Sequence, residues 1–321
     1  MKHPTQGSKL GPVLFNSYIA PVSDIAKKHG IIDEKYADDT QLILSFKPDP
    51  LASQINAVER MKKCIEDIRS FLHENKLCNN GEKTEFLLIG TTNQLKKLEI
   101  NSIKVDDIAV KAVDHARNLG VMFDKHMGME KQVNKMCKNV YFNIRNIARI
   151  RKSLTKTDLK TVVNSLVTPH LDYGNALLTG ITTKLEDKLQ VAQNSAVRLV
   201  EKVSKYEHVT KYRKALHWLP IPARIEFKLL TMTWKTLNNQ APEYMSELIQ
   251  RKQNERNLRS SHKIQLETHQ DASTNTFVNR AFSRAAPKLW NPLPENLKTK
   301  QSLEAFKKGL KTHLFNHYYK E

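Results

Sequence analysis

The chain has 321 residues, of which 40% are hydrophobic and 26% charged, so we expect about two packed domains and exclude low-complexity disorder for most of its length. Its three cysteines lie far apart, which excludes a disulfide scaffold and a paired-cysteine zinc site, and no apolar run approaches the ~20 residues that cross a bilayer. The net charge is +19 and the N-terminus lacks the apolar core of a signal peptide, so we expect a soluble intracellular protein, nuclear or cytoplasmic.

The first 124 residues predict a mixture of strands and helices. Residues 31–46 contain two apolar extended runs around a tight Ala37-Asp38-Asp39-Thr40 centre, which is typical of a β-hairpin. A long amphipathic helix follows, because apolar residues recur at helical spacing at Leu51, Ile55, Val58, Ile65, Ile68 and Leu72. Short apolar runs then predict strands at 85–89, 100–105, 108–110 and 119–123.

The rest of the chain predicts helices. Thr155 with Asp158 three residues later is typical of a helix N-terminus, and this helix should end near Val167. Two further apolar stripes run from Leu185 to Val203 and from Ile225 to Leu237. Residues 251–276 are polar and residues 285–302 are interrupted by prolines, so we expect both to be loosely structured. Together the patterns predict an α+β protein.

Asp38 and Asp39 are the sharpest chemical feature. Two adjacent carboxylates repel each other unless solvent screens them or a cation lies between them. Carboxylate, water and phosphate oxygens suit Mg²⁺, and two such ions can activate a 3′-hydroxyl and stabilise a leaving pyrophosphate. The alternative is a plain acidic turn, since Asp favours turns. The preceding Tyr36-Ala37 and the flanking apolar strands favour the metal site.

With these neighbours, Tyr36-Ala37-Asp38-Asp39 resembles the catalytic hairpin of reverse transcriptases, in the version of non-LTR (LINE-type, jockey-like) retrotransposons. Other blocks agree in order and spacing: Gln6 to Phe15 with Tyr18-Ile19, Asn80 to Glu85, and Asn118 to Val121. Segments around Asp172, Gln190, Trp218, Trp290 and Phe306 resemble the region that follows the polymerase core in such elements.

The resemblance implies a fold and a set of roles. Residues 1–124 would be a partial palm with a small antiparallel sheet, 125–250 a helical, basic, thumb-like domain, and 251–321 a C-terminal tail with short helices. Asp38 and Asp39 would hold Mg²⁺ and, with Lys83, form the catalytic set. Template and nucleotide would be positioned by Gln6, Gly7, Ser8 and Tyr36.

The resemblance also implies a third carboxylate, on a strand well before Gln6, and a fingers region. The sequence begins five residues before Gln6, so we expect both to be missing. Alignment of reacting groups contributes roughly 7–11 kcal/mol to catalysis, so the truncated chain should be close to inert by itself. It would act as an RNA-directed DNA polymerase only with a partner chain or a second copy that completes the palm on an RNA–DNA template–primer.

The charge is distributed unevenly. Residues 1–124 contain 17 basic and 17 acidic side chains, whereas the remainder contains 35 basic and 16 acidic ones, which favours a polyanionic partner. Candidate contacts to a nucleic-acid backbone are Arg145, Arg149, Arg151 and Lys152, which follow Tyr141 and Phe142. A solvated helix end is the alternative for this cluster, because cations also favour a helix C-terminus.

Two other functions therefore stay open. The chain could be a non-catalytic nucleic-acid-binding remnant, or a domesticated protein, that acts through its basic helical half. A weaker hypothesis is a protein-interaction role for the helical tail, with no nucleic acid involved.

Overall fold

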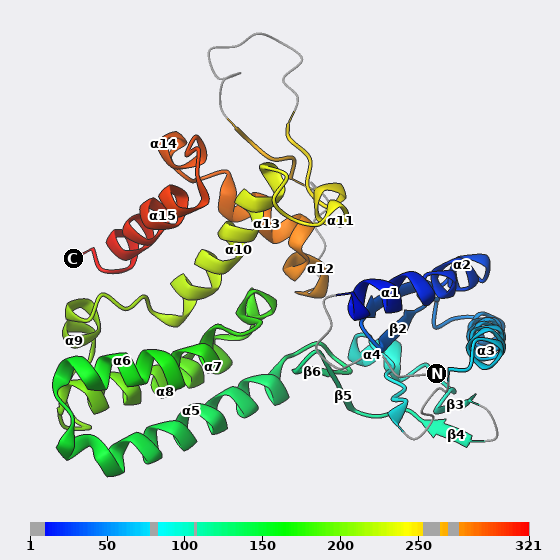
Figure 1. Cartoon of the computed structure of the whole chain (residues 1–321), viewed down its shortest axis with the longest axis horizontal. Helices are drawn as coiled ribbons and strands as arrows, with labels where there is room; N and C mark the ends of the chain where they lie inside the picture. The colour runs from blue at the N-terminus through cyan, green and yellow to red at the C-terminus, as the bar shows by residue number, and fades with distance from the viewer. Residues whose placement is uncertain (1–9, 78–82, 106–107, 253–263, 269–275, 321) are drawn as a thin grey trace, which may run out of the picture. The chain divides into compact units, whose positions relative to one another are not determined.

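The computed structural model describes residues 10–77, 83–105, 108–252, 264–268 and 276–320. It divides into two compact units, Met1–Gly128 (unit 1) and Met129–Glu321 (unit 2). Unit 1 combines helices with two-stranded antiparallel sheets and unit 2 is helical (Figure 1), which confirms the predicted α+β class. Within the described residues, no helix is both long and apolar enough to span a membrane.

Unit 1 contains four helices and three β-hairpins among its described residues. Its elements are α1 (Gly11–Tyr18), α2 (Pro21–Lys28), β1 (Ile32–Tyr36), β2 (Asp39–Ile43), α3 (Leu51–Glu74), α4 (Thr92–Leu95), β3 (Ser102–Val105), β4 (Ile108–Lys111), β5 (His115–Asn118) and β6 (Val121–Asp124). Strands pair in sequence order, β1 with β2, β3 with β4 and β5 with β6. The hairpin predicted over 31–46 is confirmed, and so are strands within 100–105 and 108–110.

Two strand predictions in unit 1 need correction. Residues 85–89 form only an isolated bridge, between Phe86 and Ala112, and the Glu85 side chain accepts a hydrogen bond from the Arg117 backbone N–H at 3.2 Å. Within 119–123, the strand begins at Val121 and Leu119-Gly120 form a turn with φ values of +44° and +84°. The partner strand β5 has no apolar run and was not predicted.

The long helix α3 is confirmed, but its buried face differs from the predicted stripe. Leu51 and Ile55 are 43% and 55% exposed, whereas Gln54 is 2% exposed. Gln54 donates from Nε2 to the carbonyl oxygens of Pro48 and Lys97, and its Oε1 accepts from the Glu99 backbone N–H. A fully hydrogen-bonded amide can be buried at low cost, so the neighbouring loops, and not the apolar stripe, decide which face of this turn is covered.

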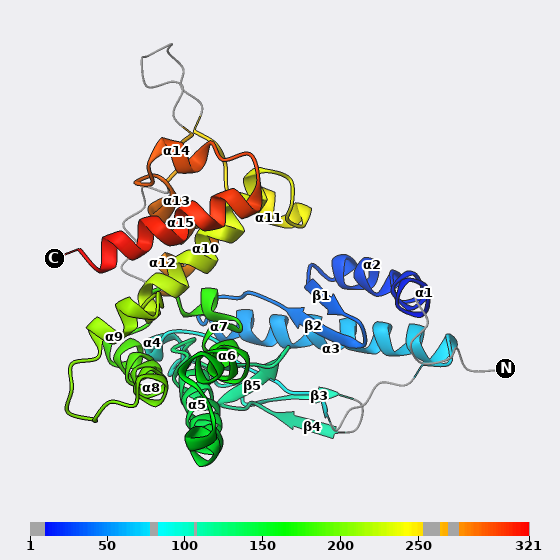
Figure 2. The ribbon, with the colours of Figure 1, turned by 60° about the vertical axis from the view of Figure 1, so that its left-hand side comes forward.

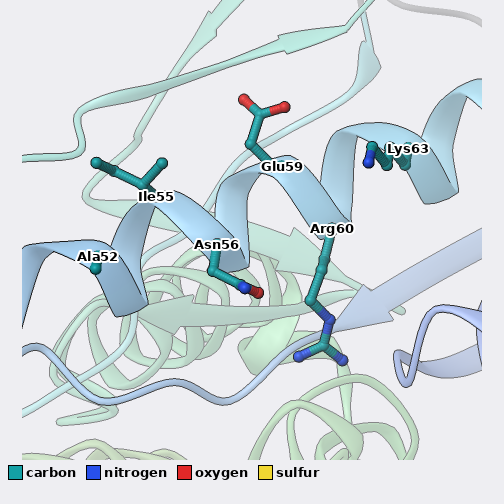
Figure 3. A pocket seen from close by; sticks show the side chains of 6 residues that line it. All are labelled: Ala52, Ile55, Asn56, Glu59, Arg60 and Lys63. Carbon is teal, nitrogen blue, oxygen red and sulfur yellow. The ribbon is translucent and has the colours of Figure 1, made fainter.

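Helix α3 also supports the segment that leads into the first hairpin. Arg60 donates to the carbonyl oxygens of His29 and Gly30, where α2 ends. Figure 3 shows Arg60 reaching away from α3, at a shallow hollow of the helix surface that Ala52, Ile55, Asn56, Glu59 and Lys63 also line. Beneath β1 and β2, a small core gathers around Val22, Ala26, Ile31, Cys64 and Ile68.

Unit 2 begins with a bundle in which α5 packs along α8, and α6 and α7 pack beside them. Its elements are α5 (Glu130–Ile150), η2 (Arg151–Ser153), α6 (Lys156–Leu166), α7 (Thr168–Asp172), η3 (Asn175–Leu178), α8 (Thr183–Glu201), α9 (Thr210–Ala215), α10 (Ile221–Leu237), α11 (Glu243–Glu247), α12 (Thr276–Arg280), α13 (Phe282–Trp290), α14 (Glu295–Lys298) and α15 (Leu303–Tyr318). The predicted helix start is confirmed, since Thr155 and Asp158 form a reciprocal capping box. The helices predicted from the two apolar stripes are α8 and α10, although Val203 lies beyond the end of α8.

The expectation of a loose segment at 285–302 is wrong. Helices α13 and α14 lie there, and α13 crosses α10 close to α15 in both views (Figures 1 and 2). Trp290 is 1% exposed, and its ring centroid lies 6.0 Å from that of the buried Phe306. Part of 251–276 is also ordered, because the backbone of Leu266 exchanges two hydrogen bonds with the Asn291 side chain. The rest of that segment lies mostly outside the described residues.

Where α10 meets α15, a half-buried acid should make unit 2 sensitive to pH. Tyr318 Oη donates to Glu226 Oε1 at 2.9 Å, and burial raises the pKa of the Glu226 carboxyl despite this hydrogen bond. Because the folded-state pKa is raised, ionisation opposes folding, and stability falls as pH rises above the ordinary carboxyl range. We expect Glu226→Gln to increase the free energy of urea unfolding at pH 7.5 and to have little effect at pH 4. The exposed Glu247→Gln is the control, and an equal gain at both pH values would contradict the prediction.

Candidate nucleotidyl-transfer hairpin and basic cluster

The β1–β2 hairpin presents the two adjacent aspartates at its tip. Tyr36 pairs with Asp39 as the last pair of the ladder, so Ala37 and Asp38 form a two-residue turn. Ala37 has a φ of +53°, which is usual for Gly and costs an L-residue about 1–2 kcal/mol. The register therefore places Asp38 in a strained turn and Asp39 at the first position of β2.

One face of this hairpin, here called the tied face, is held by hydrogen bonds to neighbouring segments, and the opposite, open face is exposed. On the tied face, Asp33 accepts from Ser23 Oγ at 2.6 Å and Lys35 Nζ donates to the Ile19 carbonyl oxygen at 3.3 Å. Strand alternation turns Tyr36 to the opposite face, where it is 68% exposed. Asp38 and Asp39 are exposed as well. A fixed hairpin thus holds its two carboxylates toward solvent, where a ligand has access to them.

The Asn118 block lies against this hairpin, and the Lys83 segment lies against the Asn118 block. Asn118 at the end of β5 donates from Nδ2 to Gln41 Oε1 of β2 at 2.7 Å. The backbone of Arg117, one residue earlier, donates to Glu85, and Lys83 lies exposed two residues before Glu85. The fold therefore joins the Asp38-Asp39 hairpin, the Lys83 segment and the Asn118 turn. Gln41 was not predicted from the sequence, where its only signal is that it shares the open face of β2 with Asp39.

Other predicted site residues are not tested by these contacts. Gln6, Gly7 and Ser8 lie outside the described residues, and so do Asn80, Gly81 and Glu82. Helix α1 begins at Gly11, within the block that starts at Gln6, and Tyr18 Oη fixes its end by donating to the Asn75 carbonyl oxygen at 2.6 Å.

The carboxylate oxygens at the hairpin tip are the type of ligand that Mg²⁺ prefers. Proteins commonly bind Mg²⁺ through one or two carboxylates, with water and substrate phosphates completing an octahedron. Asp38 in the turn and Asp39 at the start of β2 are two such adjacent carboxylates. In the part of the chain that is described, no group of three or more His, Cys, Asp or Glu side chains converges on a metal-sized site, at this tip or elsewhere. Further protein ligands for a second ion would have to come from other residues.

The basic cluster predicted in the second half lies where α5 ends. Arg145 and Arg149 are four residues apart on α5, which places them on one face of the helix, and Arg151 and Lys152 belong to η2. Arg145, Arg149 and Lys152 are exposed and Arg151 is half-buried. Phe142, one turn earlier, is 56% exposed. The cluster is thus a cationic helix end with an apolar ring beside it.

Comparison with known proteins gives one match. Residues 2–123 match the family model described as "Reverse transcriptase (RNA-dependent DNA polymerase)". This match spans the β1–β2 hairpin, the Lys83 segment and the Asn118 turn, and it lies within unit 1. No curated protein and no solved structure matches the chain. Unit 1 is therefore similar to a reverse transcriptase domain, as its motifs predicted.

Proposed function

We propose that the chain works in RNA-directed DNA synthesis, with the β1–β2 hairpin as part of the nucleotidyl-transfer site. The observation that carries this proposal is the rigid turn that presents Asp38 and Asp39 to solvent beside the Asn118 turn, in a unit similar to reverse transcriptases. The sequence blocks, continuing past residue 124, favour the non-LTR (LINE-type, jockey-like) branch of that family.

Each site residue has a role in this proposal. Asp38 and Asp39 hold Mg²⁺, which when bound lowers the barrier for attack by a primer 3′-hydroxyl. Lys83 neutralises charge on the nucleotide phosphates, and Tyr36 positions template and nucleotide together with Gln6, Gly7 and Ser8. Among the described residues only Asp38 and Asp39 supply carboxylates at the tip, so the isolated chain should be close to inert.

A second polypeptide completes the site in this proposal, and a second copy of the chain is the simplest candidate. The open face of the hairpin exposes Ile32 (61%) and Ile43 (40%), which pair directly across the ladder. Helix α1 exposes Val13 and Leu14 at 61% and 64%. Exposed apolar side chains gathered in this way are typical of protein interfaces.

Primer extension tests the proposal. Purified protein would be separated by size exclusion with light scattering, and each fraction assayed on an RNA template with a DNA primer and Mg²⁺. We expect extension in the oligomeric fraction, little or none in the monomer, and a loss of at least about 100-fold in the Asp38→Asn/Asp39→Asn double variant, because neutral amides lack the negative charge with which the two carboxylates hold Mg²⁺. Asp24→Asn, on α2 of the same unit, is the matched control.

The outcomes separate two functions. Extension that is insensitive to the double variant would show that the hairpin is not the site. No extension from any folded fraction would retire the enzymatic proposal for this chain and leave the second candidate, a non-catalytic nucleic-acid-binding protein. The charge excess after residue 124 and the exposed cluster of Arg145, Arg149 and Lys152 support that candidate.

A further inference from the structure

A second cationic surface in unit 2 lies outside the cluster at the end of α5. It is the segment 202–215, which runs from the end of α8 through α9, and we call it the α8–α9 segment. Tyr206 is 83% exposed. The exposed cationic side chains of the same segment are Lys202, Lys205, Lys211 and Lys214. Lys205 Nζ lies over the Tyr206 ring, 4.9 Å from its centroid, so a cation covers one face of a ring that is otherwise exposed.

Buried anchors hold this surface in place. Val209 is 6% exposed and Arg213 is 9% exposed. Arg213 donates to Tyr319 Oη at 2.7 Å and to Asn194 Oδ1 at 3.0 Å, which ties α9 to α15 and α8. The segment therefore has an inner side that packs and an outer side of lysines and Tyr206. Because the inner side is anchored in this way, the fold leaves the Tyr206 side chain exposed.

The acidic groups nearby are already engaged. Glu207 accepts a hydrogen bond from Tyr212 Oη, and this bond lowers the pKa of the Glu207 carboxyl. Lys211 Nζ lies 4.0 Å from the same carboxylate. Glu201, at the end of α8, pairs with Lys156 Nζ at 2.7 Å. The outer side therefore keeps an excess of positive charge.

The ion pair between Lys156 and Glu201 also locates this segment within unit 2. It joins the start of α6 to the end of α8, and α6 begins three residues after η2. Figures 1 and 2 both show α9 and the turn from α5 into α6 at the same end of α8. The α8–α9 segment thus lies at the same end of the bundle as Arg149 and Lys152.

We propose that the α8–α9 segment binds single-stranded nucleic acid, with a base stacked on Tyr206 and its phosphates held by the surrounding lysines. Stacking accepts any base, because every base has a π face. The inference rests on nucleic acid being the partner of unit 2, and it is independent of chemistry at the hairpin. In a duplex the bases are already stacked on each other, so stacking on Tyr206 favours binding of single strands over duplex.

An anionic membrane would need a different surface. Helices that lie in a membrane interface insert an apolar face. In the α8–α9 segment the apolar Val209 is buried, as is Leu216 directly after it. Its exposed side chains are lysine, histidine, serine, threonine, a single tyrosine and the small Ala215. These observations favour nucleic acid over lipid.

The test is fluorescence anisotropy with the full chain at about 0.1 M salt. The probes are labelled 20-nucleotide RNA and DNA single strands and a 20-base-pair duplex. We expect Tyr206→Ala to weaken binding of the single strands at least about fivefold, in line with the loss of one stacked base, and to change duplex binding less than twofold. Tyr206→Phe keeps the ring and should bind single strands like the wild type. Tyr244→Ala, which removes another exposed tyrosine of unit 2 (59%), is the matched control.

The outcomes distinguish the α8–α9 inference from the broader hypothesis that unit 2 binds nucleic acid. If the wild type binds nucleic acid but Tyr206→Ala behaves like Tyr244→Ala, the α8–α9 inference is wrong and the nucleic-acid partner stands. If the wild type binds neither single strands nor duplex, the nucleic-acid partner itself is wrong. Binding to phosphatidylserine vesicles that Tyr206→Ala abolishes, without oligonucleotide binding, would assign this surface to lipid and overturn the inference.

Discussion

Removing the four charges of the cluster at the end of α5 should weaken duplex binding about 1,000-fold at about 0.1 M salt. The variant is Arg145→Gln/Arg149→Gln/Arg151→Gln/Lys152→Gln. Each phosphate contact contributes about 0.9 to the slope of log K against log salt, so four lost contacts should also reduce the slope by about 3 to 4. The measurement is a salt titration of template–primer binding by fluorescence anisotropy.

The control for this prediction removes the same charge from other exposed surfaces of unit 2. Lys184, Lys308, Lys311 and Lys320 are all exposed and lie on or beside α8 and α15, and their change to Gln should cost far less affinity. Equal losses in the two variants would mean that duplex binding follows net charge alone. In that case the cluster is a solvated helix end, in which cations only favour the C-terminus of α5.

Trp290→Ala should strongly destabilise the protein. Trp290 is 1% exposed, lies against Phe306, and donates from Nε1 to the Ile264 carbonyl oxygen at 3.2 Å. Truncation of a buried aromatic side chain leaves a cavity and typically costs 3–5 kcal/mol. We expect urea unfolding followed by circular dichroism to show a loss of about 3–5 kcal/mol, with unit 2 affected.

Two further variants serve as controls for this prediction. Trp290→Phe keeps a ring in the core, although it loses the hydrogen bond to Ile264, so it should lose less than Trp290→Ala. Phe142→Ala removes a 56% exposed aromatic side chain and should change the free energy of unfolding by less than about 0.5 kcal/mol. If Trp290→Ala resembled Phe142→Ala, residues 285–302 would be peripheral to the core, as their prolines suggested.

Local pattern predicted several parts of the candidate site. Two apolar extended runs around the tight centre Ala37-Asp38-Asp39-Thr40 predicted the hairpin, because extended runs separated by a short polar turn are typical of one. The capping pair Thr155 and Asp158 predicted the start of α6 to the residue, because both hydrogen bonds of the box form within one turn. The uneven distribution of charge predicted the cationic second half. Such features depend on neighbours in the sequence, so the sequence contains the information needed to predict them.

The order of residues is thus enough to predict the hairpin with its two carboxylates, the helical and cationic second half, and the similarity of unit 1 to reverse transcriptases. Long-range packing, by contrast, determines that Gln54 is buried while Ile55 is exposed, that Gln41 meets Asn118, and that the proline-rich stretch around Trp290 closes a core. The physical reason is the same in each case. Periodicity predicts that a face exists, but which face is covered depends on segments far away in the chain that supply the packing and the hydrogen bonds.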